Sequence, residues 1–135
     1  MDSKSNDNPI VLIELWRSFP KDSYKWLLKE FKASDYDEFI AKYPPGSDGY
    51  DQVARLREFF ETVGVMNTHG LLDENLFFDV SYHLSPVWER LGPVILDWQK
   101  KVNPAIEENM AWLARRYEVW QKEVWKPDMK WKLKS

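Results

Sequence analysis

The stretch 53–91 constrains the fold of this chain most, because its apolar side chains recur at helical spacing almost without interruption. Its first helix should end near Gly70, since glycine readily adopts the left-handed conformation that closes many helices. Asp73 is positioned to cap a second helix, and Ser85-Pro86 should end that helix and begin a third. We therefore expect three consecutive helices, against which the remaining residues pack.

Gly64 lies inside the first of these helices, which we expect to span 50–68. A glycine at such a position costs roughly 1 kcal/mol relative to alanine. We predict that the cost is offset by the close approach of another helix, which the missing Cβ atom permits. At the end of the same helix, Leu71 is expected to make the apolar contact that often accompanies a glycine stop.

The residues before this stretch also carry helical patterns. A helix is expected to begin at Asn8-Pro9 and to be interrupted by Pro20, with Ser18 capping the next helix. The segment 34–37 has the hydroxyl and carboxylate spacing of a capping box, which predicts a short third helix. Residues 43–49 are rich in proline and glycine and should form a loop.

After the central stretch, a last helix should begin at Asn103-Pro104 and end at Pro127, and Pro93 should kink or split the helix before it. We expect an all-α fold without a sheet, built as a compact irregular bundle of five to seven short helices. One core suits a chain of 135 residues. The expected organisation is a flexible N-terminus (1–8), one helical domain (9–126) and a basic tail (127–135).

Composition excludes several classes of function. The chain has no Cys, so it has neither a disulfide framework nor a thiolate nucleophile. A formal net charge of −3 disfavours nucleic acid as a partner. No apolar run approaches the roughly 20 residues that span a bilayer, so we expect no integral membrane segment and a cytoplasmic location.

The helix–glycine–helix pattern of the central stretch invites comparison with DNA-reading helix-turn-helix domains. A recognition helix needs donors for base edges and phosphates. The second helix here begins Asp73-Glu74-Asn75 and has no Lys or Arg before Ser85. We therefore exclude sequence-specific DNA binding.

Five polar residues lie among large apolar ones in the central stretch and form a candidate polar cluster: Glu61, Asp79, His83, Glu89 and Arg90. Asp79 and His83 are four residues apart and would share a face of one helix. A metal site needs three or four ligands, and no third ligand accompanies this pair, so we predict no metal site and no cofactor. A buried carboxylate of the cluster would either pair with an arginine or act as a general acid in an aromatic pocket.

Aromatic residues make up 16% of the chain, including eight Trp. Such rings fill a core between short helices or form an exposed surface for a partner. A candidate interaction surface follows the last helix and the tail: Trp112, Trp120, Trp125 and Trp131. The tail itself is expected to be solvated or loosely docked.

Four segments together resemble a family of small helical bacterial proteins that is catalogued as a domain of unknown function. They are RLREFFETVG, HGLLDENLFFD, PVWERLGPVI and NPAIEENMAWLARR, and the resemblance covers roughly Asp35 to Tyr117. It implies an all-helical fold and no catalytic residue.

No nucleophile elbow, phosphate-binding loop or dinucleotide fingerprint is present. The sequence therefore favours a non-catalytic helical module that binds an unidentified protein partner or self-associates. The alternative is a small-molecule-binding protein or enzyme, with a pocket between the central helices into which Glu61, Asp79, His83 or Arg90 would project. A third possibility is peripheral membrane association through Trp125, Trp131 and the lysines of the tail.

Overall fold

A computed structural model describes the backbone of residues 3–123 and the side chains of residues 9–123. All regular secondary structure in this part of the chain is helical, which confirms the all-α prediction. Seven helices follow one another: α1 (Ser3–Arg17), α2 (Lys21–Lys29), α3 (Tyr36–Lys42), α4 (Asp48–Thr68), α5 (Glu74–Val80), α6 (Leu84–Lys101) and α7 (Glu108–Glu123).

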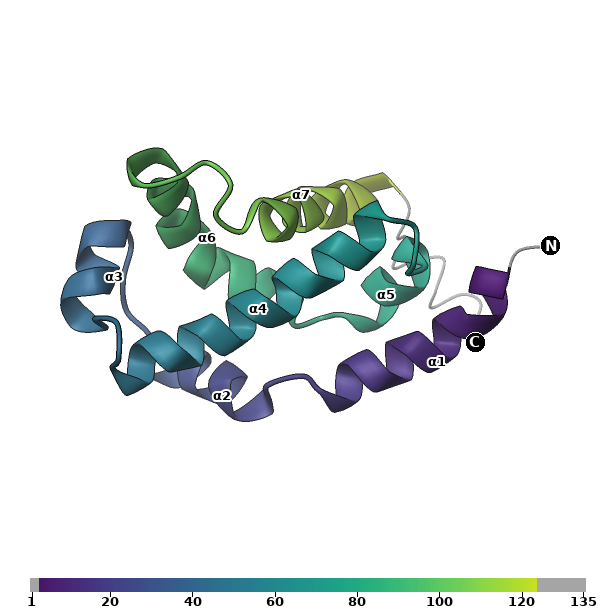
Figure 1. The fold of residues 1–135 in the computed structure, drawn as a ribbon, viewed down its shortest axis with the longest axis horizontal. Coiled ribbons are helices and arrows are strands. Elements are labelled where there is room, and N and C mark those ends of the chain that lie inside the picture. Colours follow the sequence, from purple (N-terminus) through teal and green to yellow (C-terminus); the bar gives the residue numbers. More distant parts are fainter. Residues whose placement is uncertain (1–2, 124–135) are drawn as a thin grey trace.

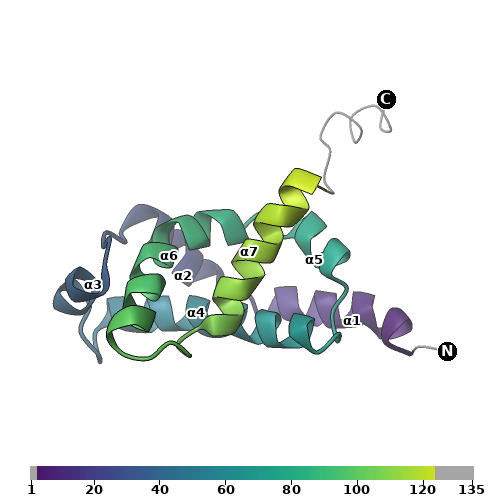
Figure 2. The ribbon, with the colours of Figure 1, turned by 90° about the horizontal axis from the view of Figure 1, so that it is seen from above.

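The longest helix, α4, runs through the middle of the molecule (Figure 1). α1 and α2 lie along one side of it, α6 and α7 lie on the other, and α3 lies at one end (Figures 1 and 2). Leu56, Phe60 and Val63 of α4 are completely buried between these neighbours. The packing is therefore that of an irregular bundle in which α7 and α2 pack most closely on α4, while α3 packs on α6 and α5 on α7.

The seam between α4 and α7 depends on Gly64, as the sequence predicts. A Cβ atom built on Gly64 would lie 2.4 Å from the backbone oxygen of Asn109 in α7 and 2.7 Å from its carbonyl carbon. These distances are shorter than any van der Waals contact, so only glycine permits this approach. The close approach of another helix at Gly64 is confirmed.

The end of α4 and the start of α5 are also as predicted, with one difference. Gly70 has φ +70°. The N–H of Gly70 donates to the carbonyl of Asn67 (3.1 Å), and the N–H of Leu71 donates to the carbonyl of Met66 (2.9 Å). These two bonds form a Schellman motif. The Asp73 carboxylate accepts from the N–H of Leu76 and caps α5 (3.1 Å). Leu71, however, is half exposed, and the buried leucine of this turn is Leu72.

The predicted starts of the first three helices need correction. α1 begins at Ser3 and contains Pro9. The helix continues through this residue although proline has no N–H with which to donate a backbone hydrogen bond. Ser18 does not cap α2, because its hydroxyl donates to the carbonyl of Leu15 (2.8 Å). The cap of α3 is Asp35, whose carboxylate accepts from Glu38 N–H (2.8 Å) while Glu38 accepts from the backbone of Ser34 (2.8 Å). A reciprocal cap is thus present, with Asp35 as the capping residue one position later than predicted, and the Glu38 carboxylate bonds to the N–H of Ser34 rather than to that of the cap.

The later helices differ from the predictions in two places. α6 is one continuous helix through Pro93, so the predicted split does not occur. A kink at Pro93, the other predicted outcome, stays a prediction. α7 begins at Glu108 rather than at Asn103. The Asn103 side chain accepts from the N–H of Ala105 (2.9 Å) and forms a turn, and Glu107 has φ +49°, outside the right-handed helical region. The predicted end of this helix, Pro127, lies outside the described residues.

Candidate functional site

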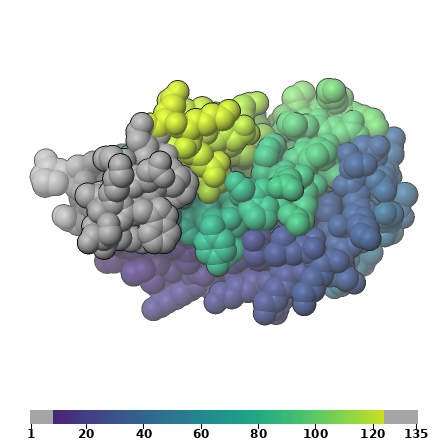
Figure 3. Space-filling view, turned by 180° about the vertical axis from the view of Figure 1, so that it is seen from behind, coloured from purple at the N-terminus to yellow at the C-terminus, as the bar shows by residue number. Residues whose placement is uncertain are grey.

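A cavity of about 580 Å³ opens between α1, α2 and the turn that joins α5 to α6. Figure 3 shows the face on which α5 and the start of α6 (teal to green) meet α1 and α2 (purple to blue). We call this cavity the aromatic pocket, because rings dominate its wall. It is lined by Trp16, Phe19, Lys21, Tyr24, Lys25, Leu28, Val80, Tyr82 and His83.

The pocket exists because α5 stops early. α5 ends at Val80, and α6 begins at Leu84, so Ser81, Tyr82 and His83 form a turn rather than a helix. The sequence predicts one helix through this region with Asp79 and His83 on a common face, and that prediction is wrong. Instead, the turn places the His83 ring against residues of α1 and α2.

Four aromatic rings surround His83. Its ring centroid lies 3.9 Å from that of Tyr82, 4.6 Å from Phe19, 4.8 Å from Tyr24 and 5.2 Å from Trp16. The Tyr82 ring is stacked on the imidazole and is 70% exposed. Burial of the imidazole among these rings lowers the pKa of His83 below its ordinary value, so the ring is neutral at pH 7.

Two buried nitrogen atoms in the rings that line the pocket have no hydrogen-bond partner among the described residues. They are Nε1 of Trp16, which is a donor, and Nδ1 of His83, which in a neutral imidazole is either a donor or an acceptor. The hydroxyl of the adjacent Ser81 is also buried without a partner. Buried polar groups in proteins are nearly always hydrogen-bonded, so these groups are exceptional. Trp16 and His83 line the pocket, but the two nitrogens are covered by neighbouring atoms, so a ligand reaches them only if the surrounding side chains shift.

The mouth of the pocket is polar and basic. Lys21 and Lys25 lie one turn apart on α2, and the Tyr24 side chain lies between them on the same helix. Burial raises the pKa of Tyr24, and the nearby Tyr82 adds to the increase, while the positive charge of Arg90 opposes it. No carboxylate belongs to the described lining of the pocket.

The structure does not bring the candidate polar cluster together. Glu61 lies on α4 and faces α7, where its two carboxylate oxygens accept from the backbone N–H of Met110 and the side-chain amide of Asn109, both at 2.8 Å. Glu61 therefore caps α7 from another helix. This contact explains why α7 begins without a capping side chain of its own.

The other members of the cluster are dispersed. Glu89 is exposed on α6 beside a smaller cavity of about 190 Å³, and Arg90 donates to the carbonyl of Pro86 (3.1 Å). Asp79 is exposed near the end of α5. Of the five residues, only His83 lines the aromatic pocket, and Arg90 lies close enough to affect the pKa of Tyr24.

A buried ion pair that the sequence does not predict lies where α4 meets the start of α7. Arg57 Nη1 is 2.7 Å from Glu107 Oε1, and the two side chains are 13% and 15% exposed. The guanidinium lies 4.6 Å from the centroid of the Trp98 ring, in cation–π geometry. Burial raises the pKa of Glu107 despite the opposing attraction of Arg57, and the charge of Glu61 adds to the increase. Fifty residues separate the two partners, so no local pattern indicates the pair.

The candidate interaction surface is only partly described, because Trp125 and Trp131 lie outside the described residues. Trp120 is 7% exposed and its indole N–H donates to the side chain of Asn75 (3.0 Å), so it belongs to the core. Trp112 is half-buried, with the Arg116 guanidinium 5.8 Å from its ring centroid.

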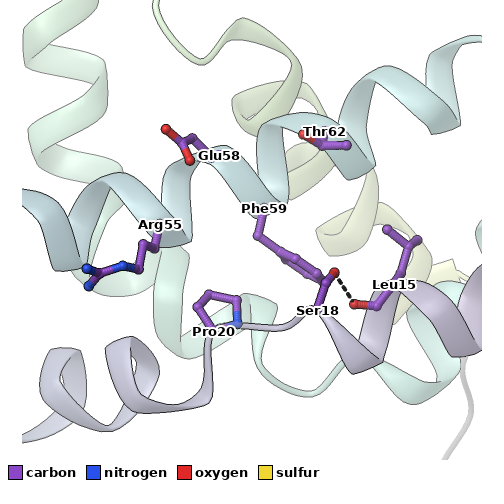
Figure 4. A pocket seen from close by; sticks show the side chains of 7 residues that line it. All are labelled: Leu15, Ser18, Pro20, Arg55, Glu58, Phe59 and Thr62. Carbon is purple, nitrogen blue, oxygen red and sulfur yellow. Dashed lines mark hydrogen bonds between the residues drawn. The ribbon is translucent and has the colours of Figure 1, made fainter.

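A second cavity, of about 340 Å³, lies between the end of α1 and α4 (Figure 4). Figure 4 shows Arg55 and Glu58 pointing in different directions from α4, while the Ser18 hydroxyl is bonded to the carbonyl of Leu15. No buried polar atom among its lining residues lacks a partner. This cavity therefore gives less indication of a ligand than the aromatic pocket does.

A metal-binding cluster and a membrane-spanning helix are both absent from the part of the chain that the structure describes. No group of three or more His, Cys, Asp or Glu in this part of the chain is arranged to hold a metal ion. None of the helices described here has the length and apolar character needed to cross a membrane.

A family model described as a domain of unknown function (DUF4760) matches residues 16–117. The resemblance inferred from the sequence is thereby confirmed, and the match begins further upstream, at Trp16, so that it includes α2. No curated protein and no solved structure matches the chain. The matched range contains every residue that lines the aromatic pocket.

Proposed function

We propose that this chain, which belongs to the DUF4760 family, is a binding protein whose site is the aromatic pocket around His83. Its ligand is a small organic molecule with an apolar body. The observation that carries this proposal is the pair of buried, unpartnered nitrogens in Trp16 and His83, whose rings line the same cavity.

The size and the lining of the pocket support a ligand of this kind. Small-molecule sites in proteins commonly enclose about 300–1,000 Å³, with apolar walls and a few polar groups. The aromatic pocket has about 580 Å³ and is walled by Trp16, Phe19, Tyr24 and Tyr82. Leaving a buried polar group unpaired costs about 1–3 kcal/mol. A ligand that displaces the atoms covering the nitrogen of Trp16 or His83 and bonds to it recovers part of that cost.

The surroundings of His83 favour binding over catalysis. A histidine that acts as a general base is usually oriented by a hydrogen bond from its other ring nitrogen to a carboxylate or carbonyl. No carboxylate lies in the described lining of the pocket, and His83 Nδ1 has no partner. The lowered pKa of His83 also keeps the ring neutral, which suits an uncharged hydrogen-bonding group.

Isothermal titration calorimetry with naphthalene-2-methanol, a neutral bicyclic probe, tests the proposal. The blocking variant is Val80→Trp, because Val80 is 41% exposed at the rim and a larger side chain there obstructs the pocket. The matched control is Val65→Trp, at a 38% exposed valine of α4 that does not line the pocket.

We expect saturable binding with one site in the native chain and in Val65→Trp, and at least a tenfold loss of affinity in Val80→Trp. Leu28→Trp, from the opposite rim, should reduce affinity in the same way. Equal affinity in all four proteins, or no binding to the native chain, would contradict the proposal. Circular dichroism of each variant establishes that it is folded.

Partner binding or self-association, which the sequence favours, remains a separate proposal, and so does a cytoplasmic location. Trp112 is the part of the candidate interaction surface that is described and accessible, since Trp120 is buried. Light scattering after size-exclusion chromatography checks self-association. A concentration-independent monomer mass, together with binding of the naphthalene probe, would favour the small-molecule function over self-association.

A further inference from the structure

We propose that the aromatic pocket selects organic anions, namely aromatic or other apolar carboxylates, over neutral and cationic molecules of the same shape. This inference rests on the proposed function of the pocket and adds the charge of its ligand. The charged side chains that line the pocket support this selectivity, because both of them are lysines.

Lys21 and Lys25 are the two charged residues that line the pocket. They are four residues apart on α2, so their side chains project from the same face of that helix. Both are exposed, and neither takes part in an ion pair among the described residues. Two cationic groups therefore border the cavity without an anionic partner on the lining.

The polar and apolar parts of the wall are arranged for an amphipathic ligand. The rings of Trp16, Phe19 and His83 are buried or half-buried, whereas Lys21 and Lys25 are exposed at the mouth. An apolar body among the rings leaves a carboxylate near the ammonium groups. Lysine is a flexible point charge, so the two residues can follow anions of somewhat different length.

Two carboxylates adjoin lining residues in the sequence, but neither of them lines the pocket. Asp22 follows Lys21 and lines a neighbouring cavity, which Lys21, Asp48 and Arg55 also line, so Lys21 borders both cavities and Lys25 borders the aromatic pocket. Asp79 precedes Val80 and is exposed, and it is not a lining residue. The charge presented to a bound molecule is therefore positive.

Exposed ion pairs contribute little individually, so the predicted selectivity is moderate. Each pairing at the surface typically changes affinity about twofold to fivefold, and salt weakens it. With two lysines, we expect naphthalene-2-carboxylate to bind about tenfold more tightly than naphthalene-2-methanol at low ionic strength. The cationic analogue, 2-naphthylmethylammonium, should bind most weakly of the three.

The test is calorimetric titration of the full chain with these three probes, at about 20 mM and about 500 mM salt, where the screening lengths differ several-fold. The double variant Lys21→Gln/Lys25→Gln removes both charges from the pocket mouth. The control is Lys29→Gln/Lys32→Gln, which removes the same charge from positions outside the lining. The two double variants have the same net charge as each other, so the long-range attraction of the whole protein for an anion is matched between them.

We expect the anion preference, measured as the ratio of the affinities for the anionic and the neutral probe, to disappear in Lys21→Gln/Lys25→Gln and at high salt. The control should keep the preference. Equal affinities for the three probes, tightest binding of the cation, or loss of preference in both variants would overturn anion selection and leave the proposed binding function intact. Failure of all three probes to bind would instead reject the proposed function itself.

Discussion

Replacing Gly64 by alanine should destabilise the protein, although the same change in most helices is stabilising. In an open helix, Gly→Ala gains roughly 1 kcal/mol. Here the new methyl group would collide with the backbone of Asn109, at 2.4 Å from its oxygen, and a backbone atom cannot move aside as a side-chain tip can. α4 and α7 must therefore separate.

Separation also weakens the cap that Glu61 provides. Its two hydrogen bonds, to Met110 N–H and to the Asn109 amide, are both 2.8 Å long, and bonds to a charged group contribute about 1.5–3 kcal/mol each. Overpacking typically costs another 1–3 kcal/mol. After subtraction of the gain in helix propensity, we expect Gly64→Ala to lower the free energy of unfolding by about 3 kcal/mol, an estimate that combines these ranges.

Urea denaturation followed by circular dichroism measures this change, with Thr62→Ala as the control. Thr62 is exposed on the same helix, so its replacement should change the free energy of unfolding by no more than about 0.5 kcal/mol. If Gly64→Ala is instead stabilised by about 1 kcal/mol, as propensity alone requires, the close contact between α4 and α7 is wrong.

Two further predictions concern the ionisable groups. Glu61→Ala should destabilise the protein by about 2–3 kcal/mol and increase amide hydrogen exchange in the first turn of α7, measured by mass spectrometry, whereas the exposed Glu58→Ala should do neither. His83→Leu should make the free energy of unfolding less sensitive to acid. The pKa of His83 is lowered in the folded protein, so the stability that this residue contributes is present above about pH 6.5. That stability is lost as the pH falls through the pKa of the folded state. Urea midpoints at pH 7.5 and pH 5 should therefore differ less in His83→Leu than in the native chain, and an unchanged difference would contradict the burial of this ring.

Local rules predicted the features whose causes are local. Gly70, Asp73 and Gly64 act through their own backbone geometry or missing Cβ atom, and the structure places each of them in its predicted role. The capping box of α3 was displaced by one residue, because Ser34 and Asp35 are both suitable caps and sequence spacing does not distinguish them.

Most of the candidate site cannot be predicted from rules that relate residues close together in the sequence. The break between Val80 and Leu84 contains no glycine, so the apolar periodicity continues across it and predicts one helix that holds both Asp79 and His83. The pocket also depends on residues that lie 67 positions apart in the sequence, Trp16 and His83. Glu61 was recognised as a candidate, but its partner in α7 is 49 residues away, and only the folded chain shows that it is a cap.

The most direct test of ligand binding at the aromatic pocket is a ¹H–¹⁵N correlation spectrum of the labelled protein during titration with naphthalene-2-carboxylate. The chain has eight Trp, each with an indole N–H signal, and Trp16→Phe identifies that of Trp16. We predict a saturable shift of the Trp16 signal, because Trp16 lines the pocket and a bound aromatic ring changes the magnetic environment of its indole N–H, with no shift of the Trp112 signal on α7. A Trp16 signal that stays fixed at saturating probe, or a Trp112 signal that moves instead, would contradict binding at His83.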